Sequence, residues 1–392
     1  MSDKVVIVDA KRSAIGRFGG ALKKELAVDS TSQIAKEMLT GKVKPQDIEE
    51  VILGNVLQAG QGQGPARQVG LKANIPVEAP AFTVNQICGS GMTSIILGMQ
   101  KILTGERSIV LVGGMESMSG APYLNLEARF GAKLGNKSFV DTILRDALTD
   151  NLLNIHMGET AENIAEKYLI SREEQDAFSL KSHQKAEEAW LNGRFSKEVI
   201  PIKTKLGGVF EEDEHYRKNM TVEQLQKLSS AFIKEGTVTA GNSSGINDGA
   251  ALLILMSKSK AEALEIPYLA EIESVASCGV APELMGLGPI ASSRAAMEKA
   301  NLSVESIDLF EINEAFAAQA IAVQKQLEIP SEKLNINGGA IALGHPVGCS
   351  GARIVVTLCH ALINEKKTYG LASLCVGGGM GLTIIIKRKE ES

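Results

Sequence analysis

The chain has 392 residues and a mass of 41.7 kDa, so we expect two or three domains rather than a single core. Hydrophobic residues make up 44% and charged residues 22%, as in an ordinary globular enzyme, and a formal net charge of −5 gives no electrostatic reason to expect a nucleic-acid partner. Five irregularly spaced cysteines fit neither a disulfide framework nor a zinc site, which favours reduced thiols, no metal and a cytoplasmic location.

The N-terminal segment carries the charged Lys4 directly before its first apolar run, residues 5–8, so it predicts a first strand rather than a signal peptide. The longest apolar runs, such as residues 250–256, are far shorter than a membrane span, and we expect no membrane association. Short apolar runs alternate with helical periodicity along the chain, which is typical of α/β architecture.

The first and last thirds of the chain predict similar successions of strand, glycine-containing turn, helix and strand. The first third predicts a strand over residues 80–84, a turn with Cys88, a helix from Met92 to Gly105, and a buried strand over residues 108–112 that Gly113 and Gly114 end. The last third predicts strands over residues 309–312 and 334–336, a glycine-rich turn with His345, a helix with Ile354 and Leu358 on one face, and strands over residues 371–376 and 382–386.

The two thirds also share local sequence. Residues 110–115 resemble residues 375–380, and residues 89–92 resemble residues 350–353. We therefore infer an internal duplication of one α/β unit. We predict three domains. The N-terminal half comprises residues 1–119 plus 248–268, the insert comprises residues 120–247, and the C-terminal half comprises residues 269–392.

The insert differs in character from both halves. Ser171 and Glu174 form a capping box that predicts the start of a long charged helix ending near Leu191, and residues 203–218 are polar and loop-like. Inserts at the mouth of an α/β sheet commonly hold the ligand, so we expect this one to do so.

Cys88 is a candidate nucleophile because it follows a strand and precedes a helix. Free backbone N–H groups and the positive end of the helix dipole surround a sulfur at such a junction and favour its thiolate. Gly89 and Gly91 allow a substrate carbonyl to come close, with N–H groups to receive its oxyanion. A buried structural cysteine is the alternative, and the other motifs below count against it.

Three further segments supply groups that would serve such a nucleophile. His345 is the only histidine in a glycine-rich turn, and imidazole is the natural base for a thiol at neutral pH. Cys375 ends a strand before three glycines, where its thiol could relay a proton and Gly377 could donate a backbone N–H. Asn313 follows the strand over residues 309–312, and its amide could hold a water. Together these groups predict covalent thioester chemistry.

These segments closely resemble the thiolase family, and within it the acetyl-coenzyme A acetyltransferases of the biosynthetic type. The similarity runs from residues 8–16 to the final strand and includes residues 54–56 and 242–249 besides the four motifs above. The resemblance implies a thiolase fold, in which two duplicated αβα halves form a five-layer αβαβα sandwich. It also implies an inserted loop domain that binds coenzyme A (CoA).

The resemblance implies a role for each catalytic candidate. Cys88 corresponds to the acylated nucleophile, His345 to the base that activates it, and Cys375 to the thiol that exchanges a proton with the α-carbon. Asn313, through a water, would join His345 in the oxyanion hole for the enolate. Backbone N–H groups of Cys88 and Gly377 would form the other hole, for the tetrahedral intermediate.

The resemblance also places CoA- and substrate-binding residues in and beside the insert. These residues are His156, Arg217 and Ser244 for CoA, with Met157, Phe232, Ala240, Met285 and Phe316 around the substrate. His156 and Met157 are typical of the short-chain type. Cys349 receives no role.

The implied reaction condenses two acetyl-CoA to acetoacetyl-CoA and CoA by ping-pong transfer through acyl-cysteine, without a cofactor. The main alternative is a degradative 3-ketoacyl-CoA thiolase of fatty-acid β-oxidation. A decarboxylating ketoacyl synthase would lack a counterpart of Cys375, and a non-catalytic acyl-binding protein would have no need of the intact triad of Cys88, His345 and Cys375. The resemblance further implies a homodimer that pairs into a homotetramer through residues 123–137.

Overall fold

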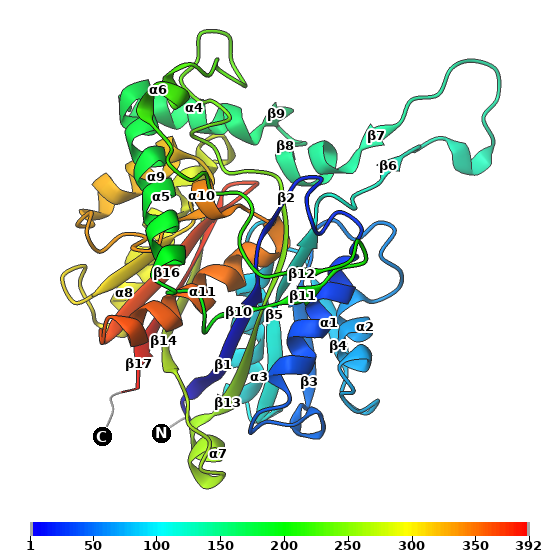
Figure 1. The fold of residues 1–392 in the computed structure, drawn as a ribbon, viewed down its shortest axis with the longest axis vertical. Coiled ribbons are helices and arrows are strands. Elements are labelled where there is room, and N and C mark those ends of the chain that lie inside the picture. The colour runs from blue at the N-terminus through cyan, green and yellow to red at the C-terminus, as the bar shows by residue number, and fades with distance from the viewer. Residues whose placement is uncertain (1–2, 390–392) are drawn as a thin grey trace.

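Nine strands lie side by side along the main sheet of the computed structural model, which describes residues 3–389 (Figure 1). The N-terminal half contributes β1 (Val5–Ser13), β3 (Glu50–Gly54), β4 (Ala81–Val84), β5 (Ile109–Ser117) and β13 (Asn247–Ser257). The C-terminal half contributes β14 (Ala270–Gly279), β15 (Leu309–Ile312), β16 (Tyr369–Val376) and β17 (Met380–Arg388). The strands predicted near residues 5, 80, 309, 371 and 382 are thus confirmed.

The strand order shows the duplication directly. In the N-terminal half the order is β4-β3-β5-β13-β1, with β3 parallel to β4 and β5 and the remaining pairs antiparallel. The C-terminal half repeats this order and these directions as β15-β16-β17-β14, with an isolated parallel bridge from Leu334 to Phe310 in the place of β4. The two halves join where β1 pairs with β14. The inferred duplication is therefore confirmed.

Two strand predictions were wrong in detail. Residues 334–336 make only that bridge, because Asn335 takes a left-handed conformation with φ +43° and leaves the extended line. The strand from Ile109 does not end at the glycines but continues to Ser117 against β13. Gly114 is needed there for space, since a Cβ on it would lie 2.1 Å from the carbonyl oxygen of Gly348.

Helices lie between the two halves and on both outer faces. Helices α3 (Ser90–Leu103) and α11 (Val347–Asn364) form the middle layer. Helices α1 (Ala27–Met38) and α2 (Pro65–Lys72) cover one outer face, and α8 (Gly288–Ala300) and α9 (Ala317–Leu327) cover the other. The expected αβαβα sandwich is therefore present.

Alternation along the strands builds these layers. On β13, Leu253 and Leu255 pack inward against the middle helices, whereas Leu252 and Ile254 pack outward against α1 and its neighbours. Each such fully buried side chain contributes about 2 kcal/mol to folding. Helix α11 is long and apolar enough to cross a bilayer, with a mean hydropathy of 1.4, but 89% of it is buried inside the protein, as in the core helix of a globular fold.

The insert lies above the carboxyl ends of the parallel strands (Figure 1). It contains α4 (Met157–Lys167), α5 (Arg172–Leu191) and α6 (Val222–Gln226), with the ladders β8 (Thr149–Asp150)–β9 (Ile155–His156) and β11 (Ile202–Lys203)–β12 (Val209–Phe210). The predicted capping box at α5 is confirmed, because the Ser171 side chain accepts from the Glu174 N–H. The domain bounds themselves stay a prediction.

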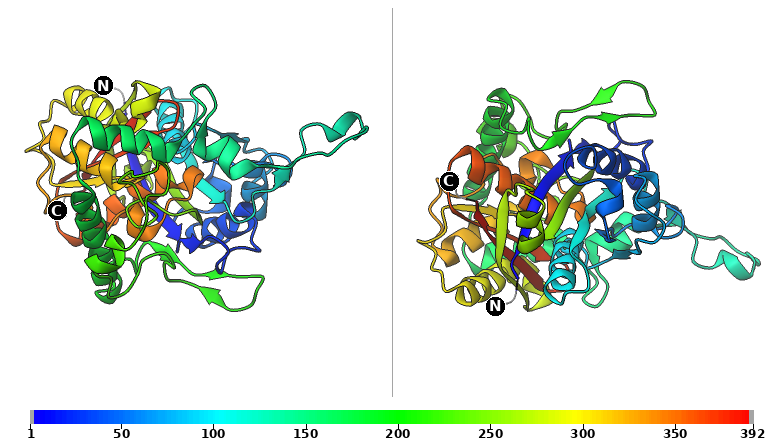
Figure 2. Two further views of the ribbon diagram at one scale, coloured as in Figure 1. Left: turned by 90° about the horizontal axis from the view of Figure 1, so that it is seen from above. Right: turned by 90° about the horizontal axis from the view of Figure 1, so that it is seen from below.

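A narrow arm extends from the insert well beyond the rest of the molecule (Figure 2). Two short strands, β6 (Tyr123–Leu124) and β7 (Val140–Asp141), pair antiparallel at its base. Its tip exposes large apolar side chains, and Phe130 is 91% exposed. The remaining short strands and α-helices are β2 (Gly16–Arg17), β10 (Val199–Ile200), α7 (Lys258–Ala263) and α10 (Ala340–Leu343).

Candidate active site

The N-termini of the two middle helices meet at glycines. A Cβ on Gly91 of α3 would lie 2.8 Å from the backbone nitrogen of Ala352 on α11, and one on Gly351 would lie 2.5 Å from that of Met92. Only glycine permits this approach. Cys88 lies two residues before α3 and His345 two residues before α11, so the contact brings together the turns that carry them.

The turn around Cys88 is tightly constrained. Ile87 has φ +49°, which is a strained conformation for a β-branched residue. Two contacts hold it: the Ser90 hydroxyl donates to the Ile87 carbonyl oxygen at 2.6 Å and accepts from the Gln86 N–H at 2.9 Å. Gly89 also donates its N–H to the Gln86 carbonyl oxygen at 2.9 Å. The strain is therefore stored directly beside the candidate nucleophile.

The electrostatics of Cys88 differ from our expectation. Burial raises the pKa of the Cys88 thiol to about 11, and the charge of Glu116 adds to this effect. The backbone N–H groups of Gly377 and of Cys88 itself point to the sulfur and offset only part of the rise. The expected preference for thiolate was wrong, because loss of solvent outweighs the helix dipole here. Cys88 rests as a thiol and needs a base during attack.

His345 has the properties of such a base. Burial and then the charge of Arg353 lower the pKa of His345 to about 4, so its imidazole is neutral at pH 7. Its Nδ1 lies 2.5 Å from the Ser350 hydroxyl oxygen, and that hydroxyl donates to the Pro346 carbonyl oxygen at 2.9 Å. Because the hydroxyl hydrogen is already used, Ser350 accepts from Nδ1–H, and Nε2 keeps the lone pair that can take a proton.

The lowered pKa of His345 gives a testable pH dependence. We expect the rate of acetyl-enzyme formation to stay level as pH falls from 7 to about 5 and to decline only near 4, because the imidazole remains able to accept a proton. The unfolded chain takes up this proton near the ordinary value of about 6.5, so the fold loses stability as pH drops below it. Single-turnover acylation at each pH, with circular dichroism to verify folding, measures the profile. Half-maximal acylation near pH 6.5 would contradict it.

The second thiol lies in the same site. Cys375 is buried on β16, and burial, followed by the charge of Cys88, raises its pKa. The charge of Cys88 acts on Cys375, and a Cβ on Gly89 would lie 3.0 Å from the Val376 side chain, so the turn of Cys88 packs on the end of β16. Beyond the strand, a Cβ on Gly377 would lie 3.4 Å from Ile87 and 3.5 Å from the Met157 sulfur, so this loop packs on both the Cys88 turn and the insert.

Asn313 also lies within this group. Its Nδ2 is 3.5 Å from Nδ1 of His345, and its own N–H donates to the Ser373 carbonyl oxygen at 2.9 Å. Among the residues described, the buried Oδ1 of Asn313 has no hydrogen-bond partner. A buried amide oxygen without a protein partner is suited to a water or a ligand.

An apolar cluster lies against the second thiol. Met157, Met285 and Phe316 pack with Cys375, and Phe232 adjoins them. The rings of Phe232 and Phe316 meet edge to face, with centroids 6.1 Å apart. The structure therefore brings together four of the five residues predicted around the substrate, whereas Ala240 is exposed and lies outside the cluster.

His156 joins the same wall from the insert. Its ring stacks on Phe232 with centroids 4.8 Å apart, and its Nδ1 accepts from the Gly158 N–H at 3.0 Å, which caps α4. Burial lowers the pKa of His156, so the ring is neutral. The His156 ring therefore extends the aromatic contacts that Phe232 makes with Phe316.

The remaining predicted binding residues lie nearer the surface. Arg217 is exposed and borders a hollow of about 590 Å³ that Ile246 also lines. Ile246 contacts the apolar cluster around Cys88, so the hollow and the thiol share a wall. Ala240 is exposed, and Ser244 is half-buried with its N–H donating to the Ala315 carbonyl oxygen at 2.9 Å.

Sequence reasoning missed three residues that support the site. Ser350 sets the imidazole tautomer, and the Asn247 side-chain oxygen accepts the His345 N–H at 2.9 Å. The Glu116 carboxylate accepts N–H groups from the loop after β3 and from Gly348, both at 3.0 Å, so it ties the two halves together below Cys88. Ser350 and Asn247 occur in segments that were noted and Glu116 directly follows one, but only tertiary contacts reveal their partners.

Comparisons with known proteins agree with this geometry. Residues 5–259 match the family model "Thiolase, N-terminal domain" and residues 266–388 match "Thiolase, C-terminal domain". A "Probable acetyl-CoA acyltransferase" of Staphylococcus aureus (strain COL) is 50% identical over 391 residues, covering 98% of this chain and 99% of the relative.

Solved structures are equally similar. The Bacillus anthracis acetyl-CoA acetyltransferase superposes with a TM-score of 0.96 at 43% identity, and human mitochondrial 3-ketoacyl-CoA thiolase with a TM-score of 0.96 at 44% identity. Each comparison covers 99% of both chains. The chain belongs to the thiolase family of acyltransferases.

Proposed function

We propose that the protein is an acetyl-CoA C-acetyltransferase that condenses two acetyl-CoA to acetoacetyl-CoA and CoA, reversibly. The observation that carries this proposal is the packing of the segments that hold Cys88, Cys375 and His345. A Cβ on Gly89 would lie 3.0 Å from the Val376 side chain, and one on Gly351 would lie 2.5 Å from the backbone nitrogen of Met92. One thiol can hold an acyl group while the other moves a proton at carbon.

In the first half-reaction, the Cys88 sulfur attacks the thioester carbonyl carbon as its proton passes to Nε2 of His345. The N–H groups of Cys88 and Gly377, which already point to this sulfur, stabilise the tetrahedral oxyanion. The bond to the CoA sulfur then breaks, and the departing sulfur takes the proton from His345. The products are acetyl-Cys88 and CoA.

In the second half-reaction, the Cys375 thiol passes its proton to Nε2 of His345 and, as a thiolate, removes an α-proton from a second acetyl-CoA. His345 and a water held by Asn313 stabilise the enolate oxygen. The carbanion attacks acetyl-Cys88, the carbon–sulfur bond breaks, and acetoacetyl-CoA leaves. The departing Cys88 sulfur takes the proton from Nε2 of His345, and Cys375 keeps the α-proton as its thiol, which restores all three groups. No cofactor enters this scheme, because the hydrogen-bond donors stabilise each negative charge.

We assign CoA to the face that the insert covers, with Arg217, Ser244 and Ala240 along the rim and His156 further in. The hollow beside Arg217 supports this assignment, since it shares Ile246 with the cluster around Cys88. Guanidinium groups suit phosphate by charge and geometry.

The apolar cluster supports a preference for short acyl chains. Met157, Phe232, Met285 and Phe316 fill the space beside Cys375, and each added methylene must displace packed atoms. We expect kcat/KM for thiolysis to fall about 10- to 100-fold from acetoacetyl-CoA to 3-ketohexadecanoyl-CoA. Met285→Ala, which shortens one side chain of this cluster, should reduce the difference in kcat/KM between the two substrates.

The alternative is a degradative 3-ketoacyl-CoA thiolase. It is supported by the similarity to human mitochondrial 3-ketoacyl-CoA thiolase, which is as high as the similarity to the Bacillus anthracis acetyltransferase. Thiolysis rates over a series of four to sixteen carbons distinguish the two. Equal rates across the series would assign the protein to the degradative type.

We further propose a homodimer that pairs into a homotetramer through the arm between β6 and β7. The apolar tip of the arm supports this, because Phe130 and Leu134 are almost completely exposed in the single chain. Light scattering in solution measures the oligomeric state.

We also propose a cytoplasmic location for the protein. All five of its cysteines are free, which supports a reducing compartment, and cell fractionation would test the location.

A further inference from the structure

Asn313 lies between two residues that are held from outside the reaction site. On one side, the Asn335 side chain clasps both polar backbone groups of Ile312. Its Oδ1 accepts the Ile312 N–H at 2.9 Å, and its Nδ2 donates to the Ile312 carbonyl oxygen at 2.9 Å. Since the Asn313 N–H is bound to β16, the peptide that leads into Asn313 is fixed at both of its polar atoms.

On the other side, the Glu314 carboxylate anchors the chain. It accepts from Asn335 Nδ2 at 2.8 Å, from the Ser182 hydroxyl at 2.7 Å and from the Ile341 N–H at 3.2 Å. Glu314 is 1% exposed, and burial raises its pKa. Ile341 precedes His345 by four residues, so this carboxylate ties the segment of Asn313 to the segment of the base.

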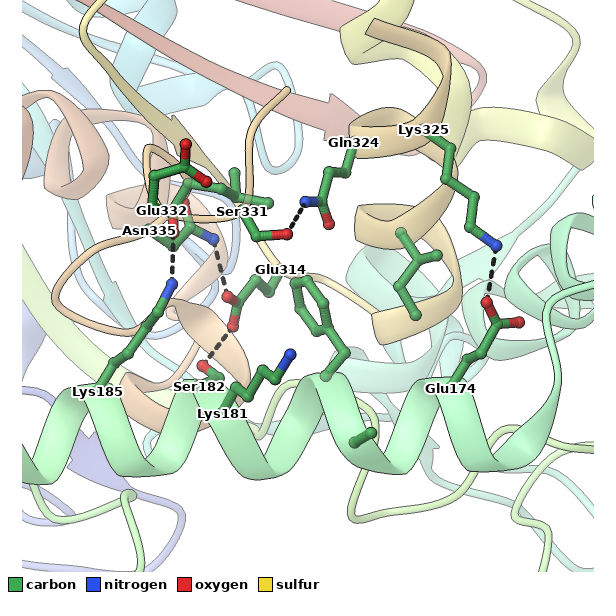
Figure 3. A pocket seen from close by; sticks show the side chains of 14 residues that line it. Glu174, Lys181, Ser182, Lys185, Glu314, Gln324, Lys325, Ser331, Glu332 and Asn335 are labelled. Atoms are coloured by element: carbon green, nitrogen blue, oxygen red, sulfur yellow. Dashed lines mark hydrogen bonds and ion pairs between the residues drawn. The ribbon is translucent and has the colours of Figure 1, made fainter. Parts of the chain in front are cut away.

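These three side chains border a cavity whose lining includes neither Cys88 nor Cys375. Ser182, Glu314 and Asn335 line a cavity of about 570 Å³ between α5, α9 and residues 331–335, and Figure 3 shows their contacts within it. Ser182 also accepts the Gly339 N–H at 3.0 Å. The insert helix α5 is thus joined to both catalytic segments.

Asn335 adopts a costly conformation to make these contacts. It is 2% exposed and has φ +43°, a left-handed backbone that only asparagine, aspartate and glycine tolerate readily. Its two amide atoms make three hydrogen bonds with the residues around Asn313. The most direct consequence of these contacts is a fixed direction for the Asn313 side chain.

We propose that Asn335, with Glu314 and Ser182, forms a clasp that positions Asn313 against His345 for the enolate step. Asn335 is a positioning residue, since it touches no reacting atom. This inference rests on the proposed function, in which Asn313 serves the enolate and not acyl transfer to Cys88. The clasp therefore affects one half-reaction and spares the other.

Asn335→Gly is the test, because glycine accepts the left-handed backbone and removes only the side chain. We expect deuterium exchange into the methyl group of acetyl-CoA to fall about 10- to 100-fold, as for a small misplacement of a catalytic group. Acetyl-enzyme formation should stay within about twofold of wild type. Each exchange rate is divided by the amount of enzyme that forms acetyl-enzyme in the same preparation.

Asn337→Gly is the matched control. Asn337 is an equally buried asparagine in the same loop, but its side-chain oxygen accepts from Arg194 of the insert at 3.5 Å, and among the residues described it makes no hydrogen bond to Ile312 or Glu314. Its ratio of exchange to acylation should equal that of wild type. Ser182→Ala is a milder second variant, because it removes the hydrogen bonds to Glu314 and from Gly339 but leaves Asn335 on Ile312. It should show the same selective loss, about two- to fivefold.

An unchanged ratio of exchange to acylation in both Asn335→Gly and Ser182→Ala overturns the clasp as a positioning device. A wild-type enzyme that forms no acetyl-enzyme and exchanges no proton refutes the proposed function instead, so the two failures are distinguishable. Melting temperatures of all variants separate loss of stability from loss of position.

Discussion

Cys88→Ala is expected to abolish acetyl-enzyme formation and to lower the rate of condensation by about 10⁴-fold or more, because the atom that carries the acyl group is removed. The fold should survive, since the side chain is only partly buried and the turn is held by Ser90 and Gly89 rather than by the sulfur. Mass spectrometry after incubation with acetyl-CoA measures the adduct directly.

The matched control for this variant is Cys278→Ala. Cys278 is also a partly buried free thiol, but it lies on β14, where its backbone pairs with Gly381, and it has no role in the proposed reaction. It should acylate and turn over as wild type does. An acetyl group found on a residue other than Cys88 in the wild type, or retained in Cys88→Ala, would falsify the assignment of the nucleophile.

Cys375→Ala is expected to separate the two half-reactions. Cys88, His345 and the N–H of Gly377 remain, so acetyl-enzyme should still form, whereas deprotonation of the α-carbon loses its base. We expect condensation and deuterium exchange to fall about 10³-fold or more, within the range for loss of a general base and its correctly placed proton.

The measurement pairs a single-turnover acylation assay with exchange in heavy water on the same preparation. Cys375 packs in the apolar cluster, so alanine leaves a cavity, and a lowered melting temperature is also expected. Exchange that persists at the wild-type rate would mean that another group acts on carbon, with His345 the nearest candidate.

Local sequence predicted most of the fold because local rules build most of it. The short apolar strand over residues 309–312 and the capping box at Ser171 each have a cause within a few residues, and both predictions held. The errors arose where distant contacts decide. The strand expected over residues 334–336 fails because Asn335 turns back to hold Ile312, and that contact spans 23 positions.

The candidate site shows the same division. Motifs identified Cys88, His345 and Cys375 by residue type and neighbouring glycines. They did not reveal that burial raises the pKa of the Cys88 thiol, because burial depends on the insert and on β16, which are remote in sequence. They also left Ser350 without a role, since its effect on His345 requires both the helix geometry and the Pro346 carbonyl oxygen.

The meeting of α3 and α11 at Gly91 and Gly351 has a consequence for how the protein acquires activity during folding. The nucleophile and its base are separated by well over half the chain, and closing so long a loop is slow compared with forming either half locally. Each half can complete its own strands before the glycine contact exists. We therefore expect the ability to form acetyl-enzyme to appear only when the two halves dock at Gly91 and Gly351, after their secondary structure is complete.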